Sequence, residues 1–209
     1  MKKIWVIVLS LVWFNFPSFA QDNSADTGSS SSSRIQDSLT REITFLGLPI
    51  SGNANTLATA LTKKGFTIKE RTPKYWSLKG MFLDKYCDIY IRLTTQSKTV
   101  WQIDVFFPDQ ENWYTLKGQY QDICDKLSVK YDSPTTTYSF FSDPYYEGDG
   151  YELQALRLEK CTYQSLWEYK KGIISCGIFK TGSVNITYES ADGAKLNDAE
   201  DLKKSQEEL

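Results

Sequence analysis

The clear period of two in the side chains of residues 99–107 constrains the fold more than any other feature of the sequence. The apolar side chains recur at every second position: Trp101, Ile103, Val105 and Phe107. Gln102 and Asp104 lie between them. A strand has a period of two residues, so one face of this segment is predicted to be buried and the other wet. A sheet with one wet face is predicted to be antiparallel, because parallel sheets are normally covered on both faces.

The remaining periodic segments predict an α+β domain at residues 41–190. We expect strands at residues 66–70, 75–82, 86–93, 99–107, 135–141, 151–160, 162–169, 173–180 and 183–189. Apolar residues three and four apart predict helices at about 55–64 and 110–131. This order gives two halves, about 41–109 and 110–190. We therefore predict a pseudo-repeat of one helix packed on a four- to five-stranded antiparallel sheet. Residues 191–209 are expected to form a charged tail with a frayed helix near its end.

The N-terminus indicates export. Lys2 and Lys3 precede an apolar run at residues 4–14, which is followed by Pro17 and by Ser18-Phe19-Ala20. This pattern predicts a signal peptide cleaved after Ala20, with an uncleaved anchor as the alternative. We expect a periplasmic or secreted protein with no membrane span after cleavage.

The segment at residues 21–40 contains five consecutive serines and is predicted to be a flexible linker. Asp37-Ser38-Leu39 matches a short sequon for periplasmic O-glycosylation, so Ser38 is a candidate for that modification.

The composition excludes several classes of chemistry. The chain has no histidine, which removes Ser-His-Asp and Cys-His catalysis and imidazole zinc sites. A net charge of −2 argues against binding to nucleic acid. We expect no catalytic residue, metal site or cofactor. One alternative stays open, because four carboxylates crowd a single loop and could hold calcium or act as the acid and base of a glycosidase: Asp143, Glu147, Asp149 and Glu152.

Four cysteines raise the question of disulfides. They are Cys87, Cys124, Cys161 and Cys176. Export permits disulfides, and Cys87–Cys124 is the favoured pair because the second helix should pack on the first strands. Cys87 and Cys176 also share strand faces with isoleucines, so small buried hydrophobes are the alternative. A turn at Lys170-Lys171 would place Cys176 opposite Ser165 and not opposite Cys161.

The segment at residues 138–151 holds six aromatic residues around a Pro/Gly loop. Tyrosines on a loop provide large contact areas with few rotatable bonds, which suits recognition. The candidate binding residues are four tyrosines with two flanking tryptophans: Tyr138, Tyr145, Tyr146, Tyr151, Trp76 and Trp167. The alternative is that the strand aromatics pack inward and the tyrosines lie over the sheet edge.

Two resemblances follow from these residues. The opening Phe45-Leu46-Gly47-Leu48-Pro49-Ile50-Ser51-Gly52, a helix and then Lys64-Gly65-Phe66 resembles the start of a group of uncharacterised secreted proteins of gut bacteria. Their pattern is F-x-G-I-P-I-x-G, helix, K-G-F. The two halves are similar in topology to the tandem helix-plus-sheet repeat of the β-lactamase inhibitor protein fold.

These observations favour a non-catalytic exported binding protein. It would engage a protein or peptide, in the envelope or outside the cell, through the aromatic loop or the exposed face of the sheet. A carboxylate-based glycan hydrolase and a structural envelope protein are the alternatives.

Overall fold

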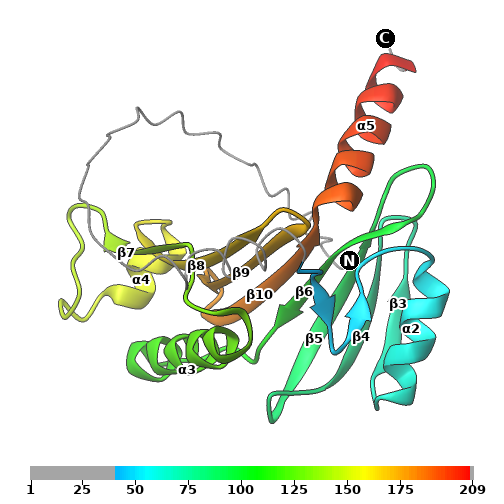
Figure 1. Cartoon of the computed structure of the whole chain (residues 1–209). Coiled ribbons are helices and arrows are strands. Elements are labelled where there is room, and N and C mark those ends of the chain that lie inside the picture. The colour runs from blue at the N-terminus through cyan, green and yellow to red at the C-terminus, as the bar shows by residue number, and fades with distance from the viewer. Residues whose placement is uncertain (1–40, 208–209) are drawn as a thin grey trace, which may run out of the picture.

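The computed structural model describes residues 41–207. The predicted signal peptide, the linker and Ser38 lie outside this range. Eight strands form one antiparallel sheet in the order β3-β4-β5-β6-β10-β9-β8-β7 (Figure 1). The fold is therefore α+β with a large antiparallel sheet, as predicted. The expected count of four to five strands per sheet is not confirmed, because β6 and β10 join all eight strands in one sheet.

The strands of the sheet have well-defined bounds. They are β3 (Thr67–Arg71), β4 (Tyr75–Phe82), β5 (Lys85–Leu93), β6 (Val100–Phe106), β7 (Thr136–Phe141), β8 (Cys161–Tyr169), β9 (Gly172–Phe179) and β10 (Ser183–Ser190). Two short strands, β1 (Thr44–Phe45) and β2 (Leu48–Pro49), pair separately. The helices are α2 (Ala54–Lys63), α3 (Trp113–Tyr131), α4 (Glu152–Arg157) and α5 (Ala191–Glu207). None of these described helices is long and apolar enough to cross a membrane.

Local chemistry sets the ends of α2 and α3. The Asn53 side chain accepts a hydrogen bond from the backbone N–H of Asn55 at 2.7 Å, and Asn112 caps α3 in the same way. Each cap satisfies N–H groups that have no partner within the helix. Gly65 follows α2 at φ +94°, a left-handed conformation that glycine adopts without strain. The predicted helix boundaries agree with these caps within a few residues.

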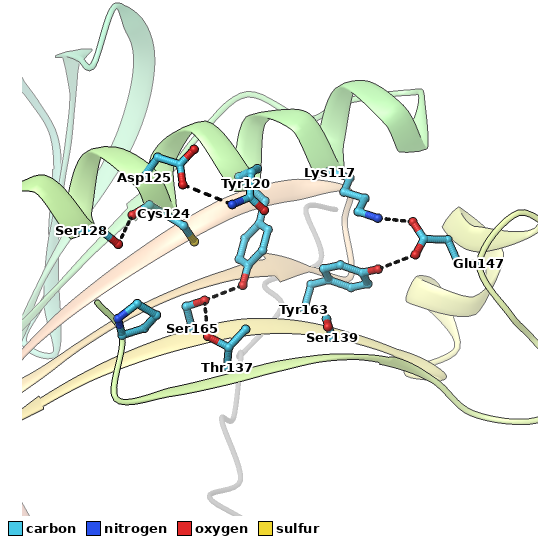
Figure 2. A pocket seen from close by; sticks show the side chains of 12 residues that line it. Lys117, Tyr120, Cys124, Asp125, Ser128, Thr137, Ser139, Glu147, Tyr163 and Ser165 are labelled. Atoms are coloured by element: carbon cyan, nitrogen blue, oxygen red, sulfur yellow. Dashed lines mark hydrogen bonds and ion pairs between the residues drawn. The ribbon is translucent and has the colours of Figure 1, made fainter. Parts of the chain in front are cut away.

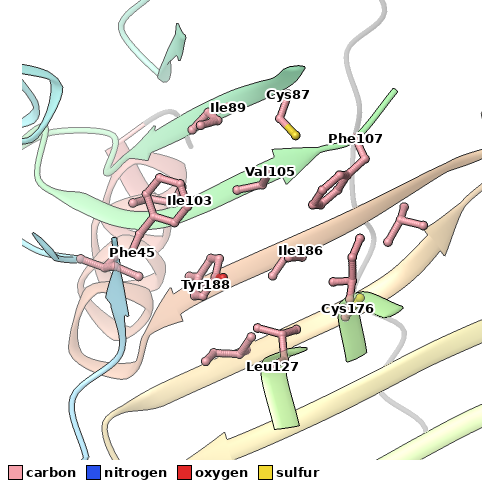
Figure 3. Packing of buried hydrophobic residues seen from close by; sticks show 14 of the residues in the cluster. Phe45, Cys87, Ile89, Ile103, Val105, Phe107, Leu127, Cys176, Ile186 and Tyr188 are labelled. Carbon is pink, nitrogen blue, oxygen red and sulfur yellow. The ribbon is translucent and has the colours of Figure 1, made fainter. Parts of the chain in front are cut away.

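One face of the sheet, which we call the covered face, carries the core. Its strand residues are buried at every second position: Leu78, Ile89, Ile91, Ile103, Val105, Ile174, Cys176, Val184, Ile186 and Tyr188. The apolar stripe of α3 and the ring of Phe45 pack on it, with Phe45 at 5.5 Å from Tyr188 between ring centroids (Figure 3). Gly80 also lies on this face, and a Cβ there would lie 2.5 Å from the Phe66 ring. The missing side chain therefore lets Phe66 close the core.

The alternate residues of the same strands form the opposite side, which we call the open face. Most of its side chains are half-buried or exposed: Tyr75, Ser77, Lys79, Tyr90, Arg92, Gln102, Phe106, Tyr138, Phe140, Gln164, Ser175, Phe179, Asn185 and Thr187. The prediction of one buried and one wet face is confirmed.

Two predicted elements differ from the structure. The strand expected at residues 151–160 is wrong, because Glu152–Arg157 forms α4. Its buried residues are Glu152, Ala155 and Leu156, a helical spacing, and Glu159 at φ +59° ends the segment. In the tail, α5 begins at Ala191, directly after β10. The Glu200 carboxylate of α5 accepts hydrogen bonds from the backbone N–H groups of Gln96 and Ser97, which ties the helix to the β5–β6 loop.

Candidate functional site: the open face of the sheet

Four aromatic rings cross the open face in one row, which we call the aromatic row: Tyr75, Tyr90, Phe106 and Phe179. Successive ring centroids lie 5.7, 5.7 and 5.6 Å apart, and each pair meets edge to face. The row runs diagonally from β4 through β5 and β6 to β9. Between β6 and β9 the row crosses β10 near Asn185, which is paired across the strands with Phe106 of β6 and Gly177 of β9. Edge-to-face packing of each ring on the next stabilises this arrangement.

A buried carboxylate lies beside the row. Asp104 is 3% exposed and accepts hydrogen bonds from Arg92 Nε at 2.7 Å and from Thr187 Oγ1 at 3.0 Å. The Gln102 amide also donates to it. A buried charge is tolerated only when it is paired and hydrogen-bonded, and Asp104 meets both conditions. This network fixes the polar centre of the open face.

Other charges on the open face differ in how well they are compensated. Lys79 and Asp88 form a half-exposed ion pair at 3.3 Å between β4 and β5. Glu189 is the exception: burial, with the nearby charges of Asp198 and Asp104, raises the pKa of its carboxyl group. The centre of the face therefore has balanced charge, with Glu189 as a carboxylate that the fold disfavours in its ionised form.

At the β7 edge, the open face carries two well-exposed aromatic side chains. Tyr138 and Phe140 are 41% and 50% exposed, and β7 has no second neighbour in the sheet. Tyr138 lies opposite Gln164 of β8. It is the one sequence-predicted binding residue that the structure places on the open face.

The two predicted tryptophan platforms lie on the covered face. Trp167 is 1% exposed and donates from its indole N–H to the Asp132 carbonyl at 2.8 Å, so the surface role predicted for it does not hold. Trp76 is half-buried against the core, with the Arg71 guanidinium 4.5 Å from its ring centroid. Both residues lie on the same face of their strands as buried residues two positions away, which explains their burial.

The tyrosine loop, residues 142–151, also lies away from the open face. Tyr146 and Tyr151 are 65% and 60% exposed, as a recognition role would require. Tyr145 is half-buried, and its hydroxyl accepts a hydrogen bond from the Gln154 amide. The loop reaches toward α3, because Glu147 pairs with Lys117 (Figure 2).

The carboxylates of this loop serve its own backbone. Asp149 accepts hydrogen bonds from the backbone N–H groups of Tyr146 and Tyr151, and Glu152 accepts one from Gly148. The Lys117 ammonium holds the pKa of the Glu147 carboxyl below its usual range. No group of three potential metal ligands occurs within the described residues 41–207. Three of the four carboxylates therefore have structural partners.

A cleft of about 370 Å³ lies on the covered side between α3 and the strands β7 and β8 (Figure 2). One end holds Glu147, which pairs with Lys117 and accepts from the Tyr163 hydroxyl at 3.1 Å. Hydroxyl groups line the middle, where Tyr120 and Ser165 are hydrogen-bonded at 2.7 Å. Cys124 also contributes to the lining. This polar interior contrasts with the apolar packing elsewhere on the covered face.

All four cysteines are buried and carry free thiols. The structure does not bring the expected pair Cys87 and Cys124 together. Cys87 lies in β5, and its thiol faces the carbonyls of Phe82 and Lys85. Cys124 lies on α3, which packs on β9 and β10, so its thiol neighbour is Cys176. The predicted register is confirmed, since Cys176 lies opposite Ser165.

Sequence reasoning missed the aromatic row, although the sequence contains a signal for it. Tyr75, Tyr90 and Phe106 occupy solvent-facing positions of strands whose alternate positions are apolar. Large aromatics at solvent-facing strand positions are not required by the core, so they are candidates for a contact surface. The row itself could not be predicted, because its members come from four strands whose order and register the sequence does not state.

Comparison of the chain with protein families, with curated proteins and with solved structures finds no match.

Proposed function

We propose that this chain is an exported, non-catalytic binding protein whose open face recognises a folded protein partner. The aromatic row is the observation that carries the proposal. Its rings lie on the side of the sheet that the core does not use, and each ring packs edge to face on the next. Rigid aromatic side chains lose little conformational entropy on binding, and they dominate the energetics of protein interfaces.

The geometry of the rings favours a protein over a glycan. A sugar stacks flat on an exposed ring face, whereas these rings meet edge to face and cover one another's faces. The charges argue against a strongly charged ligand, since Lys79 and Arg92 are each paired with a carboxylate. A near-neutral aromatic surface with a fixed polar centre fits a protein patch of mixed apolar and hydrogen-bonding character.

Tyr138 and Phe140 would extend this interface to the β7 edge. Tyr146 and Tyr151, on the tyrosine loop, are proposed as a separate and smaller contact region, because their loop lies toward α3. The two regions make different demands on a partner. A partner that contacts only one region should bind equally well after substitutions in the other.

We also infer that the halves of the domain are a pseudo-repeat. In each half a helix precedes four strands of the sheet, and the final strands, β6 and β10, meet at the centre. This arrangement supports the proposed resemblance to the tandem helix-plus-sheet repeat. An experimental structure tests it: residues 54–106 should superpose on residues 113–190, helix on helix and strand on strand, with α4 as an insertion.

Site-specific photo-crosslinking in the native cells tests the proposed function. The photo-crosslinking residue benzoylphenylalanine replaces Tyr90 in one variant and Phe179 in another. Both variants should crosslink to the same single partner protein. The matched control is Tyr114→benzoylphenylalanine, because Tyr114 is 80% exposed on α3, away from the open face. Equal crosslinking from position 114, no crosslink from positions 90 and 179, or a crosslink only to a second copy of the chain would contradict the proposal.

A further inference from the structure

Three contacts bring the thiols of α3 and β9 to one place. Tyr120 and Cys124 lie one turn apart on the same side of α3, and both line the cleft. The Tyr120 hydroxyl is hydrogen-bonded to Ser165 of β8 at 2.7 Å. Ser165 is the direct cross-strand partner of Cys176 on β9, so their side chains share the covered face. Cys124 therefore lies over Cys176, and the two thiols interact.

We propose that Cys124 and Cys176 form an intramolecular disulfide when the chain meets a low-molecular-weight disulfide oxidant. The pairing differs from the one expected from the sequence, and it does not depend on the proposed function of the open face.

The two thiols are suited to successive steps. Cys124 is 6% exposed and lines the cleft, so it is the more accessible of the two thiols, whereas Cys176 is 0% exposed. Hydrogen bonds from Cys176, Ser165 and Tyr120 lower the pKa of the Cys124 thiol, whereas burial raises the pKa of Cys176. The thiolate is the attacking species in disulfide exchange, so Cys124 reacts first.

The exchange balances with one oxidant molecule, R–S–S–R. The Cys124 thiolate attacks one sulfur, forms a mixed disulfide and releases R–S⁻, which takes up the proton that Cys124 lost. Cys176 then gives up its proton and attacks Cys124 Sγ. The S–S bond of the protein forms, and a second R–SH leaves. The protein loses two hydrogen atoms, and the oxidant is reduced to two thiols.

The other cysteines lack this arrangement. The Cys161 thiol lies near the carboxylates of Glu147 and Glu152, and burial raises its pKa to about 12. It is four residues along β8 from Ser165, the partner of Cys176, which places it about 13 Å away along the strand. A disulfide requires Cα atoms within about 7 Å. Cys87 faces backbone carbonyls in the β4–β5 hairpin.

Peptide mapping of the purified chain tests the proposal. The native protein is incubated with glutathione disulfide, denatured, alkylated and digested. We expect a crosslinked peptide pair containing Cys124 and Cys176, the loss of two hydrogen atoms, and alkylated Cys87 and Cys161. The Cys176→Ala variant should stop at a glutathione adduct on Cys124. The Cys124→Ser variant should form neither product, and the control Cys87→Ala should still form the crosslink.

A second readout separates the native pairing from a random one. The oxidised wild-type chain should unfold at a higher urea concentration than the reduced chain, because the bond closes a loop between α3 and β9. Four alkylatable thiols after incubation, a crosslink that involves Cys87 or Cys161, or a lower urea midpoint after oxidation would overturn the proposal.

Discussion

The two faces of the sheet are built from the same strands and differ in almost every other respect. Val105 is fully buried on the covered face, whereas Phe106, the next residue, contributes to the aromatic row on the open face. The covered face carries the aliphatic and aromatic residues of the core and is closed by helices. The open face has one row of aromatic rings beside the ion pair of Arg92 with the buried Asp104. The core therefore lies on the covered face, and the rings of the open face are the ones to which we assign the proposed recognition role.

The covered face itself is divided. Near α2 it is apolar and closely packed, with Phe66 against the space above Gly80. Near α3 it becomes the polar cleft with hydroxyls, the Lys117–Glu147 ion pair and the Cys124 thiol. The proposed Cys124–Cys176 disulfide would form in this second region.

The comparison is tested most strongly by shortening a covered-face side chain. Ile103→Ala should lower the free energy of unfolding by about 2–5 kcal/mol, because Ile103 is completely buried and its loss leaves a cavity. Urea denaturation measures the change. Val129→Ala, at a position 91% exposed on α3, is the control and should change the value by less than about 0.5 kcal/mol. Similar losses in the two variants would remove the basis for a covered-face core.

The buried ion pair on the open face should give an intermediate effect. Asp104→Ala leaves the Arg92 guanidinium without its partner and removes the acceptor of Thr187 and Gln102. We expect a loss of about 1–3 kcal/mol in urea denaturation. Asp88→Ala breaks only the half-exposed pair with Lys79 and should cost less than about 1 kcal/mol. If Asp88→Ala costs as much as Asp104→Ala, the open face has no special polar centre.

Glu189 should show the smallest effect and the opposite sign. Its pKa is raised in the folded state, so the native chain binds a proton more tightly than the unfolded chain does. Stability should therefore decrease as the pH rises from the unfolded pKa, about 4.3, to the raised native pKa, and the penalty should persist above it. Glu189→Gln should increase the free energy of unfolding at neutral pH by less than about 1 kcal/mol, after allowance for solvent screening. Denaturation as a function of pH measures this gain, which should vanish below about pH 4; a constant gain at every pH would indicate another cause.

The sequence predicts the parts of the fold that depend on periodicity. The alternation around Ile103 predicts β6 and its two faces, and the register that places Cys176 opposite Ser165 follows from the hairpin turn. The sequence misses α4, because a six-residue helix gives too short a period to distinguish from a strand. It also misses the neighbours that only tertiary packing creates. Tyr75 and Phe179 lie at opposite ends of the aromatic row, and the strands between them, β5, β6 and β10, come from both halves of the chain.

The candidate site follows the same rule. Tyr138 is predicted from the aromatic-rich segment at residues 138–151, and it does lie on the open face. Trp167 is assigned to the wrong face, because the residue type alone does not show which face of the sheet a side chain is on. Parity can be assigned only when the register of neighbouring strands is known. The aromatic row therefore emerges from the structure and not from the segment with the most tyrosines.

The affinity of the photo-crosslinked partner for open-face variants tests the central claim most directly. The Tyr90→Ala and Phe179→Ala variants should each bind that protein at least about tenfold more weakly than the wild-type chain, a loss of about 1.4 kcal/mol. Circular dichroism and urea denaturation should show that both variants stay folded. Tyr114→Ala should bind like the wild type, because Tyr114 lies on the outer side of α3. Unchanged affinity in the two open-face variants, or an equal loss in Tyr114→Ala, would contradict the account.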